Sequence, residues 1–311
     1  MVVGAVAQDE VARECPLTGA AIGDARGVIV HNEAAALELS RTTDVPVAYV
    51  PLFAVPITPP PRLQLWRRAA GTKPYRIVIF GYVGHNRRLV AVLRALHAFP
   101  ERQQFRLDVY GTVANERAVV RTVAELGLTN LVTFHGFVSD AVLDRALERS
   151  DLAINLRNPT MGEVSASQLR IWQHALPSLV TDVGWYATLP PETVATVRSA
   201  AEQEDLLLHL GNFLADPEPY RKMGQNGRTH VNRHHTIDAY VDGMLAAAEA
   251  AVASRTRAVV RRMSLRAGHA MRPWFTDEAA DVLLPRVTGT IGRLFDKSAG
   301  ERRGDVLPAR R

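Results

Sequence analysis

Short apolar runs alternate with helical patterns along the chain from Arg76 onward. Each run ends in a glycine or polar turn, and a stretch with apolar residues at helical spacing follows it. The runs that we predict to be strands are Arg76–Phe80, Arg106–Tyr110, Leu131–Phe134, Asp151–Leu156, Ser178–Thr181 and Val194–Val197. Strands that alternate with helices are joined by right-handed crossovers, so they form a parallel sheet covered on both faces. The sequence therefore predicts an α/β fold.

The helical patterns begin directly after most of these strands. The predicted helices are Arg87–Phe99, Asn115–Leu126, Asp140–Glu148, Ser165–Leu176, Glu202–Leu214, Pro217–Asn232 and Ile237–Ala253. Ligands of parallel sheets bind at the carboxyl ends of the strands, where the strand order switches. The loops to search for a binding site are those after Phe80, Tyr110, Phe134 and Leu156.

The loop after Leu156 combines a glycine, a carboxylate and the start of a helix. The SASQ motif at Ser165 fits a capping box, in which the serine side chain accepts a hydrogen bond from an N–H near Gln168. The N–H groups and the dipole of such a helix attract phosphate. Gly162 and Glu163 lie just upstream, and because a carboxylate repels phosphate, Glu163 is expected to accept hydrogen bonds from hydroxyls. A sugar phosphate would fit this combination of groups. The alternative is that the SASQ motif only caps a helix and binds no ligand.

The loop after the first strand of the sheet reads GYVGHNRR. Gly81 and Gly84 let the backbone approach a ligand, and Arg87 and Arg88 can neutralise a diphosphate. The alternative is an ordinary strand-to-helix turn followed by a solvated arginine. The loop lacks the glycine pattern of dinucleotide-binding and Walker motifs, which argues against a module for a nicotinamide cofactor.

Composition and charge indicate a globular protein with a basic tail. The chain is 47% hydrophobic and 22% charged, and its single cysteine excludes an internal disulfide framework. No apolar run approaches the length of a membrane-spanning helix, and the single cysteine makes a reducing cytoplasm the expected location. Residues 255–311 hold 13 Lys and Arg against 6 Asp and Glu, whereas residues 1–254 carry a net charge of −2. The tail is predicted to contact an anionic membrane at its inner face, unless it is only a solvated helix; nucleic acid is not expected.

Four segments are predicted: 1–58, 59–74, 75–253 and 254–311. The first holds a helical pattern at Gly4–Glu14, and its short strands, Gly27–Val30 and Val45–Val50, flank a helix at Glu33–Arg41. Two short strands cannot build a core of their own, so this segment looks like the end of a domain. The second is a linker that follows a proline-dense stretch. The third holds the sheet, and the fourth is a basic helical tail with a disordered end.

Histidines near the end of one predicted helix have a spacing that zinc ligands use. His230 and His234 are four residues apart, and His235 follows them. No acidic residue or cysteine lies beside them. A metal site is therefore not predicted.

Six sequence phrases carry a resemblance to a known family. They are, in order between residues 76 and 250, RIVIFGYVG, LDVYG, LVTFHGFVSD, DLAINLRNPTMGE, ALPSLVTDVGWY and MGQNGR. With them the segment resembles the C-terminal, donor-binding domain of glycosyltransferase family 4, retaining enzymes with the GT-B fold of two Rossmann-like domains. Residues 27–52 resemble the last strands of the family's N-terminal domain. The resemblance implies a Rossmann-like sheet, the C-terminal half of a GT-B fold, with most of the N-terminal domain missing.

The resemblance implies an activity and roles for particular residues. The activity is transfer of a sugar from a nucleotide diphosphate sugar to an acceptor hydroxyl, with retention of configuration, in carbohydrate biosynthesis and without a cofactor or metal. Basic residues after the first strand of this domain hold the diphosphate in the family, which points to Arg87 and Arg88. Ser165 and Ser167 stand near the family's glycine-rich phosphate contact.

The family usually has two glutamates in the donor site. Glu163 matches the one that contacts the donor sugar, and we predict it to be the catalytic residue. The position of the second, which contacts the ribose, falls on Arg170. An arginine cannot accept a hydrogen bond from a ribose hydroxyl, but it can donate one or bind a phosphate. Arg170 is therefore counted among the predicted donor-binding residues.

Two functional hypotheses follow. In the first, the protein is a glycosyltransferase that binds a nucleotide sugar and a glycan, lipid or small-molecule acceptor. In the second, it is a truncated or non-catalytic module that only binds a nucleotide sugar. The second hypothesis rests on the incomplete N-terminal domain, which builds the acceptor site in the family, and on Arg170.

Overall fold

The computed structural model describes residues 22, 25–57, 74–160, 162–271, 286, 289 and 290. They fall into two compact units. The larger unit holds residues 31–35 and 50–241, and the smaller holds the described residues of 1–30, 36–49 and 242–311. Almost all of the predicted linker, the predicted helix Gly4–Glu14 and the tail end that we expect to be disordered lie outside the described residues. The four predicted segments stay a prediction.

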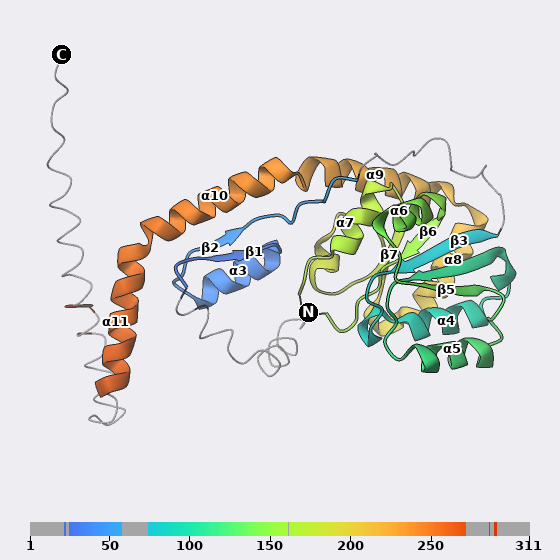
Figure 1. Ribbon diagram of the computed structural model, residues 1–311, viewed down its shortest axis with the longest axis horizontal. Coiled ribbons are helices and arrows are strands. Elements are labelled where there is room, and N and C mark those ends of the chain that lie inside the picture. Colours follow the sequence, from blue (N-terminus) through green and yellow to red (C-terminus); the bar gives the residue numbers. More distant parts are fainter. Residues whose placement is uncertain are drawn as a thin grey trace, which may run out of the picture. The chain divides into compact units, whose positions relative to one another are not determined.

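The larger unit is built on a six-stranded sheet in the order β5-β4-β3-β6-β7-β8. Its strands are β3 (Tyr75–Phe80), β4 (Phe105–Tyr110), β5 (Val132–Gly136), β6 (Leu152–Ile154), β7 (Ser178–Thr181) and β8 (Ala195–Val197), and all pair in parallel. The chain adds β4 and β5 on one side of β3 and then returns to place β6 on the other side. The strand order therefore switches between β3 and β6, and the predicted parallel sheet is confirmed (Figure 1).

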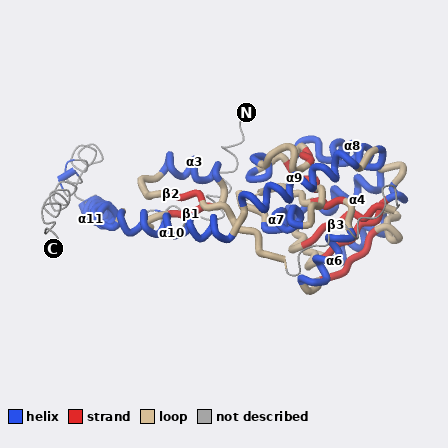
Figure 2. The backbone as a smooth tube through the Cα atoms, turned by 90° about the horizontal axis from the view of Figure 1, so that it is seen from above, coloured by secondary structure: helices blue, strands red, loops and turns tan. Residues whose placement is uncertain are grey.

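Helices cover both faces of this sheet (Figure 2). They are α4 (Leu89–Ala98), α5 (Glu116–Glu125), α6 (Asp140–Arg149), α7 (Ala166–Gln173), α8 (Glu202–Ala215) and α9 (Glu218–His234). The unit also holds the first turn of α10 (Ile237–Ala253) and short 3-10 turns at His85–Arg87, Arg102–Gln104, Gly184–Thr188 and Ser199–Ala201. Ile77 and Ile79 of β3 pack against α4, α5 and α8. Val78 and Phe80, which point to the other face, pack with α6 and α7.

Helix α9 crosses α7 at a glycine that leaves room for a buried indole. A Cβ at Gly227 would lie 2.1 Å from Cδ1 of Trp172, whose side chain is fully buried. The indole N–H donates to the carbonyl of Thr193 at 3.1 Å, which keeps the ring in place. The two helices can approach this closely only because residue 227 has no side chain.

Replacing Gly227 by alanine should lower the free energy of unfolding by about 1–3 kcal/mol, since the new methyl group must displace the ring of Trp172. Gly211→Ala in α8 is the matched control, because its Cβ would meet only Cε2 of Phe99, at 3.9 Å. Alanine is favoured over glycine inside a helix by about 0.5–1 kcal/mol, so the control should be neutral or stabilising. Urea unfolding of both variants tests the contact, and equal stabilities would refute it.

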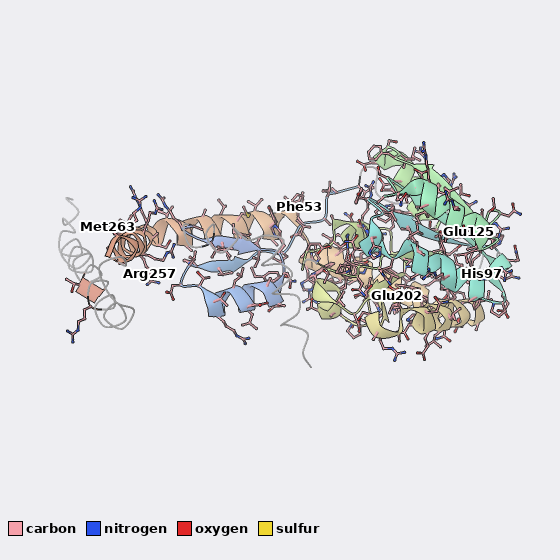
Figure 3. The ribbon with its side chains drawn as sticks, turned by 90° about the horizontal axis from the view of Figure 1, so that it is seen from below. Phe53, His97, Glu125, Glu202, Arg257 and Met263 are labelled. Carbon is pink, nitrogen blue, oxygen red and sulfur yellow. The ribbon has the colours of Figure 1, made fainter. Side chains whose placement is uncertain are left out.

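The smaller unit contains a parallel pair of strands, β1 (Val28–Val30) and β2 (Val47–Tyr49). Helix α3 (Glu33–Thr42) connects them, and α11 (Arg255–Met271) follows α10. The guanidinium of Arg261 donates to the carbonyl of Ala25 at 2.7 Å, and this contact ties α11 to the segment before β1. Arg257 and Met263 of α11 are exposed (Figure 3). In the part of the chain that is described, no helix is long and apolar enough to cross a membrane.

Candidate functional site

The loops that follow β3 and β6 meet at the point where the strand order switches. The N–H of Asn158 donates to the carbonyl of Asn86 at 2.8 Å, which joins the two loops directly. The first loop is also held to β4, because the N–H of Gly81 donates to the carbonyl of Tyr110 at 3.0 Å. Two of the loops singled out from the sequence are therefore neighbours in space.

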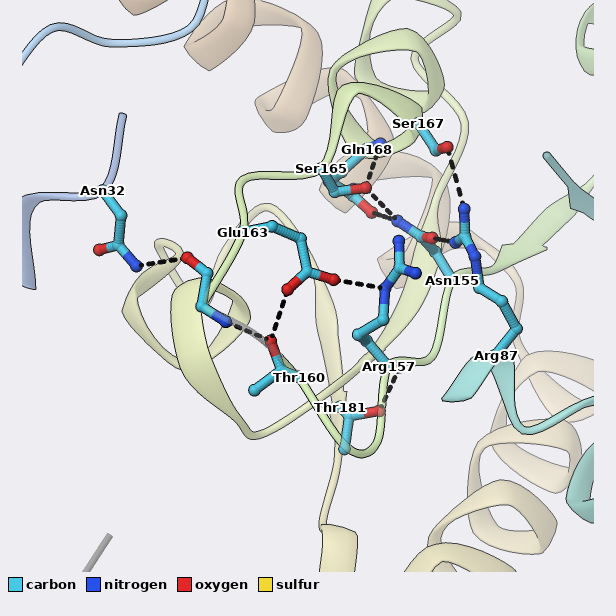
Figure 4. A network of polar contacts seen from close by, with 11 residues as sticks. Asn32, Arg87, Asn155, Arg157, Thr160, Glu163, Ser165, Ser167, Gln168 and Thr181 are labelled. Carbon is cyan, nitrogen blue, oxygen red and sulfur yellow. Dashed lines mark hydrogen bonds and ion pairs between the residues drawn. The ribbon is translucent and has the colours of Figure 1, made fainter. Parts of the chain in front are cut away.

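Arg87 lies at the centre of this meeting point. Its side chain is buried, and its two terminal nitrogens donate to Oδ1 of Asn155 and, at 3.1 Å, to Oγ of Ser167 (Figure 4). Its Nε is buried without a hydrogen-bond partner among the described residues. A Cβ at Gly81 would lie 3.2 Å from the Arg87 guanidinium and 3.7 Å from the Ser167 hydroxyl. Gly81, Arg87 and Ser167 thus lie close together, and their contact with a donor stays a prediction.

The start of α7 is fixed by a chain of buried hydrogen bonds. Ser165 caps the helix, and its Oγ accepts from the Gln168 N–H at 3.1 Å, which confirms the capping interaction expected from the sequence. The amide of Asn155 donates to Oε1 of Gln168 at 2.9 Å, and Gln168 donates to the Ser178 hydroxyl at 2.8 Å. These bonds connect β6, α7 and β7, so the helix start is held rigidly beside Arg87.

Glu163 lies in the same loop system, with its side chain 35% exposed. Its Oε1 is 3.2 Å from Nε of Arg157, and its Oε2 accepts from the Thr160 hydroxyl at 3.1 Å (Figure 4). The preceding Gly162, with φ of +80°, is held from both sides. Its N–H donates to the Thr160 hydroxyl, and its carbonyl accepts from the Asn32 amide at 3.2 Å. The carboxylate therefore sits on a braced loop beside the Arg87 cluster.

Two predicted binding residues are engaged elsewhere. The guanidinium of Arg88 makes hydrogen bonds of 2.9–3.1 Å to both carboxylate oxygens of Glu202. Arg170 lies 2.7 Å from Asp140 and 2.8 Å from Asp144, both on α6. Neither is hydrogen-bonded to the residues around Arg87, and their contact with a donor remains a prediction.

The turn between Arg87 and Arg88 explains why these neighbours separate. The predicted helix from Arg87 begins at Leu89 instead, and Arg88 adopts the left-handed conformation with φ of +57°. Gly84 lies at the start of the 3-10 turn that contains Arg87. A Cβ there would be 3.3 Å from the side chains of Tyr82 and Asn86. The loop geometry thus sends one arginine into the site and the other to α8.

The surroundings of Arg87 destabilise the charged form of its side chain. Burial first, and then the nearby charge of Arg157, lower the pKa of Arg87 to about 10, while Tyr186 and Glu163 oppose this shift. The group stays protonated at neutral pH. It makes no ion pair with any described residue, and its hydrogen-bond partners, Asn155 and Ser167, are neutral. An anion is the ligand that would stabilise it most.

Two of the three histidines singled out for their spacing, His230 and His235, take part in packing, whereas His234 is exposed. The ring of His230 lies edge-on to Trp172, and burial lowers its pKa to about 4. Nδ1 of His235 is 2.6 Å from the carbonyl of Leu52. Among the residues that the structure describes, no group of three or more histidine, cysteine or acidic side chains could hold a metal ion.

Three residues of the cluster were missed from the sequence. Asn155 and Gln168 are fully buried connectors, and Arg157 binds Glu163. Asn155 and Arg157 interrupt the apolar run at the carboxyl end of β6, which is where the sheet rule places ligand contacts. That signal could have found both. No sequence signal indicated Gln168 beyond its place in the capping box.

A parallel sheet with its site at the switch point is the architecture of the Rossmann-like domains of GT-B glycosyltransferases. Sucrose-phosphate synthase from Thermosynechococcus elongatus matches 77% of this chain with a TM-score of 0.62 and 20% identity, and 63% of that protein is covered. WaaG, a glycosyltransferase involved in lipopolysaccharide biosynthesis, matches 70% of this chain with a TM-score of 0.56 and 18% identity, and 61% of it is covered. HepE from Anabaena, in complex with UDP, matches 69% with a TM-score of 0.57 and 13% identity, and again 61% is covered.

The family of the chain is shown by its sequence. The model of the glycosyl transferase-like family matches residues 87–246, slightly more than half of the chain. The chain therefore belongs to this family. It spans less than two thirds of the length of each of the three solved structures above. No protein of curated function matches the sequence.

Proposed function

We propose that the protein is a glycosyltransferase that transfers a sugar from a nucleoside diphosphate sugar to an acceptor hydroxyl with retention of configuration. The observation that carries this proposal is Arg87, a buried cation without an ion-pair partner among the described residues, at the switch point of a Rossmann-like sheet. The diphosphate of a donor supplies the missing negative charge. Membership of the glycosyl transferase-like family supports the reaction, and the complex of HepE with UDP supports a uridine nucleotide as the first donor to test.

In the proposed reaction, the leaving diphosphate is stabilised by charge and by backbone donors. Arg87 and the N–H groups at the start of α7 bind the phosphates, and Ser165 and Ser167 supply further polar groups. Glu163 accepts hydrogen bonds from hydroxyls of the donor sugar and so orients the anomeric carbon. No metal ion or other cofactor enters this proposal. The acceptor is a glycan, a lipid or a small molecule.

The test is to incubate the full chain with UDP-, GDP- and ADP-linked sugars and a panel of acceptors. We expect release of the nucleoside diphosphate, and a product whose anomeric configuration, measured by NMR, equals that of the donor. An inverted product would refute retention. Binding of a nucleotide sugar without turnover would favour the second candidate, a non-catalytic module, which is motivated by the pairing of Arg170 with α6 where the family places a ribose-binding glutamate.

We also propose that the basic tail contacts an anionic membrane, where a cytoplasmic enzyme would meet a lipid-linked acceptor. Helix α11 carries five arginines and no acidic residue, and Val259 and Met263 are exposed on it. Arginines at a lipid surface contribute about 1 kcal/mol each. An exposed basic helix with apolar residues on its surface is typical of peripheral binding.

Replacing the four exposed arginines of α11 by glutamine should weaken binding of the protein to phosphatidylserine vesicles by about a hundredfold or more. These arginines are Arg255, Arg257, Arg262 and Arg266. Arg261 is left unchanged because it holds the carbonyl of Ala25. Vesicles of phosphatidylcholine alone are the control, and sedimentation is the measurement. Equal binding of both proteins to anionic vesicles would refute the contact.

A further inference from the structure

A second arginine lies beside Arg87, and it comes from a different loop. Arg157 follows β6, and the hydrogen bond between Asn158 and Asn86 joins the chain one residue away from each arginine. The N–H of Arg157 itself donates to the Thr181 hydroxyl at 3.0 Å, which fixes its backbone against β7. The loops therefore bring two guanidinium groups to the same edge of the sheet (Figure 4).

One carboxylate, that of Glu163, lies in this cluster, and it pairs with Arg157. Arg157 approaches Glu163 through Nε, at 3.2 Å, and Arg87 is bound only by the neutral side chains of Asn155 and Ser167. The terminal nitrogens of Arg157 make no hydrogen bond to any residue in the described ranges, although the side chain is only 15% exposed. The cluster thus holds two positive charges and one negative charge. The net positive charge of the cluster attracts a phosphate anion.

A polar group without a partner lies close to this charge. The Tyr186 hydroxyl is buried and has no hydrogen-bond partner among the described residues, and Tyr186 influences the ionisation of Arg87. Nε of Arg87 is also buried without a partner, on a side chain only 5% exposed. A buried donor that lacks an acceptor is unfavourable, and a ligand that supplies the acceptor removes that cost. An anion bound beside Arg87 would supply such an acceptor.

Arg88, the residue next in sequence, is poorly placed to act as the second cation. Both oxygens of Glu202 bind its guanidinium, and the carboxylate of Glu202 is 9% exposed. The charge of Arg88 is therefore already neutralised. Moving it to a ligand would leave Glu202 buried and unpaired, which is strongly unfavourable.

We propose that Arg157, together with Arg87, binds the diphosphate of the donor, and that Arg157 thereby allows Glu163 to lie next to that diphosphate. This inference rests on the proposed function. Arg157 forms an ion pair with Glu163 through Nε, at 3.2 Å, and its terminal nitrogens can at the same time donate hydrogen bonds to a phosphate oxygen. Without Arg157, the carboxylate of Glu163, which is proposed to bind the donor sugar, would repel the phosphates. Arg157 is thus a binding residue for the diphosphate and a positioning residue for Glu163.

The test is calorimetric titration of the full chain with UDP, GDP, ADP and inorganic pyrophosphate. Arg157→Gln should weaken binding of pyrophosphate and of the preferred nucleotide by about tenfold or more, because a charge-assisted contact is lost. Arg157→Lys should lose less, since it keeps the charge without the planar fork. Arg94→Gln, at an exposed position on α4, is the matched control and should bind like the wild type.

A second variant separates ligand binding from a purely structural role. Glu163→Gln should tighten pyrophosphate binding, because it removes a repulsive charge, and it should restore part of the binding lost in Arg157→Gln. A structural role for Arg157 would produce neither effect. Unchanged binding by Arg157→Gln, or a larger loss in Arg88→Gln at an unchanged melting temperature, would overturn the inference and leave the proposed function intact. A wild-type chain that binds none of the four probes would overturn both.

Discussion

Glu163→Gln should reduce sugar transfer by about a hundredfold or more. The carboxylate can accept two hydrogen bonds from sugar hydroxyls, and each such bond to a charged group contributes about 1.5–3 kcal/mol. Glutamine has nearly the same shape, but its amide nitrogen cannot accept a hydrogen bond. The loop itself should persist, because Thr160 and Asn32 hold Gly162 through the backbone. Turnover of a nucleoside diphosphate sugar, measured as release of the nucleotide, checks this expectation.

Glu125→Gln is the matched control for this experiment. Glu125 ends α5, where it is exposed and far along the chain from the loops of the site (Figure 3). Its replacement should leave turnover at the wild-type rate. Transfer that continues unchanged in Glu163→Gln would remove Glu163 from the catalytic site.

Arg87→Met should strongly weaken donor binding and yet leave the protein as stable as before, or more stable. The lowered pKa of Arg87, about 10, means that folding places its charge in an unfavourable environment. A shift of this size corresponds to about 3 kcal/mol, part of which is offset by its bonds to Asn155 and Ser167. Methionine fills a similar volume without the charge. Residues that bind ligands often cost stability in the free protein in this way.

Two measurements check the Arg87 expectation together. Titration with UDP should show at least about a hundredfold weaker binding, because the central cation of the site is gone. Thermal unfolding without ligand should give a melting temperature equal to or above that of the wild type. A melting temperature many degrees lower would instead identify Arg87 as a structural residue that holds β6 to α7.

The fold could be predicted from the sequence because its signals are local. Apolar runs of strand length alternate with helical periodicity, and every predicted strand of the sheet is present within a few residues of its predicted bounds. The cap at Ser165 was predictable for the same reason, since a capping box lies within one turn of helix.

The site could be predicted only in part, because side-chain direction depends on the turn and on distant partners. Arg87 and Arg88 looked equivalent in the sequence, but the left-handed conformation of Arg88 sends them to different partners. Arg170 looked like a binding residue by its position in the family pattern. It is paired with two carboxylates of α6, which lie 30 and 26 residues earlier in the chain. No local pattern could indicate that pairing.

The sequence by itself determined the alternation of strands and helices, the parallel sheet, and the loops in which polar residues gather at its carboxyl edge. Only the tertiary structure decided which of the charges in those loops meet. It brought Arg87 to Ser167, bound Arg157 to Glu163, and engaged Arg88 with Glu202. The periodicity of apolar residues is a property of neighbours along the chain, so it is visible in the sequence itself. Pairing of charges depends on distances across loops and layers, and these exist only once the chain has folded.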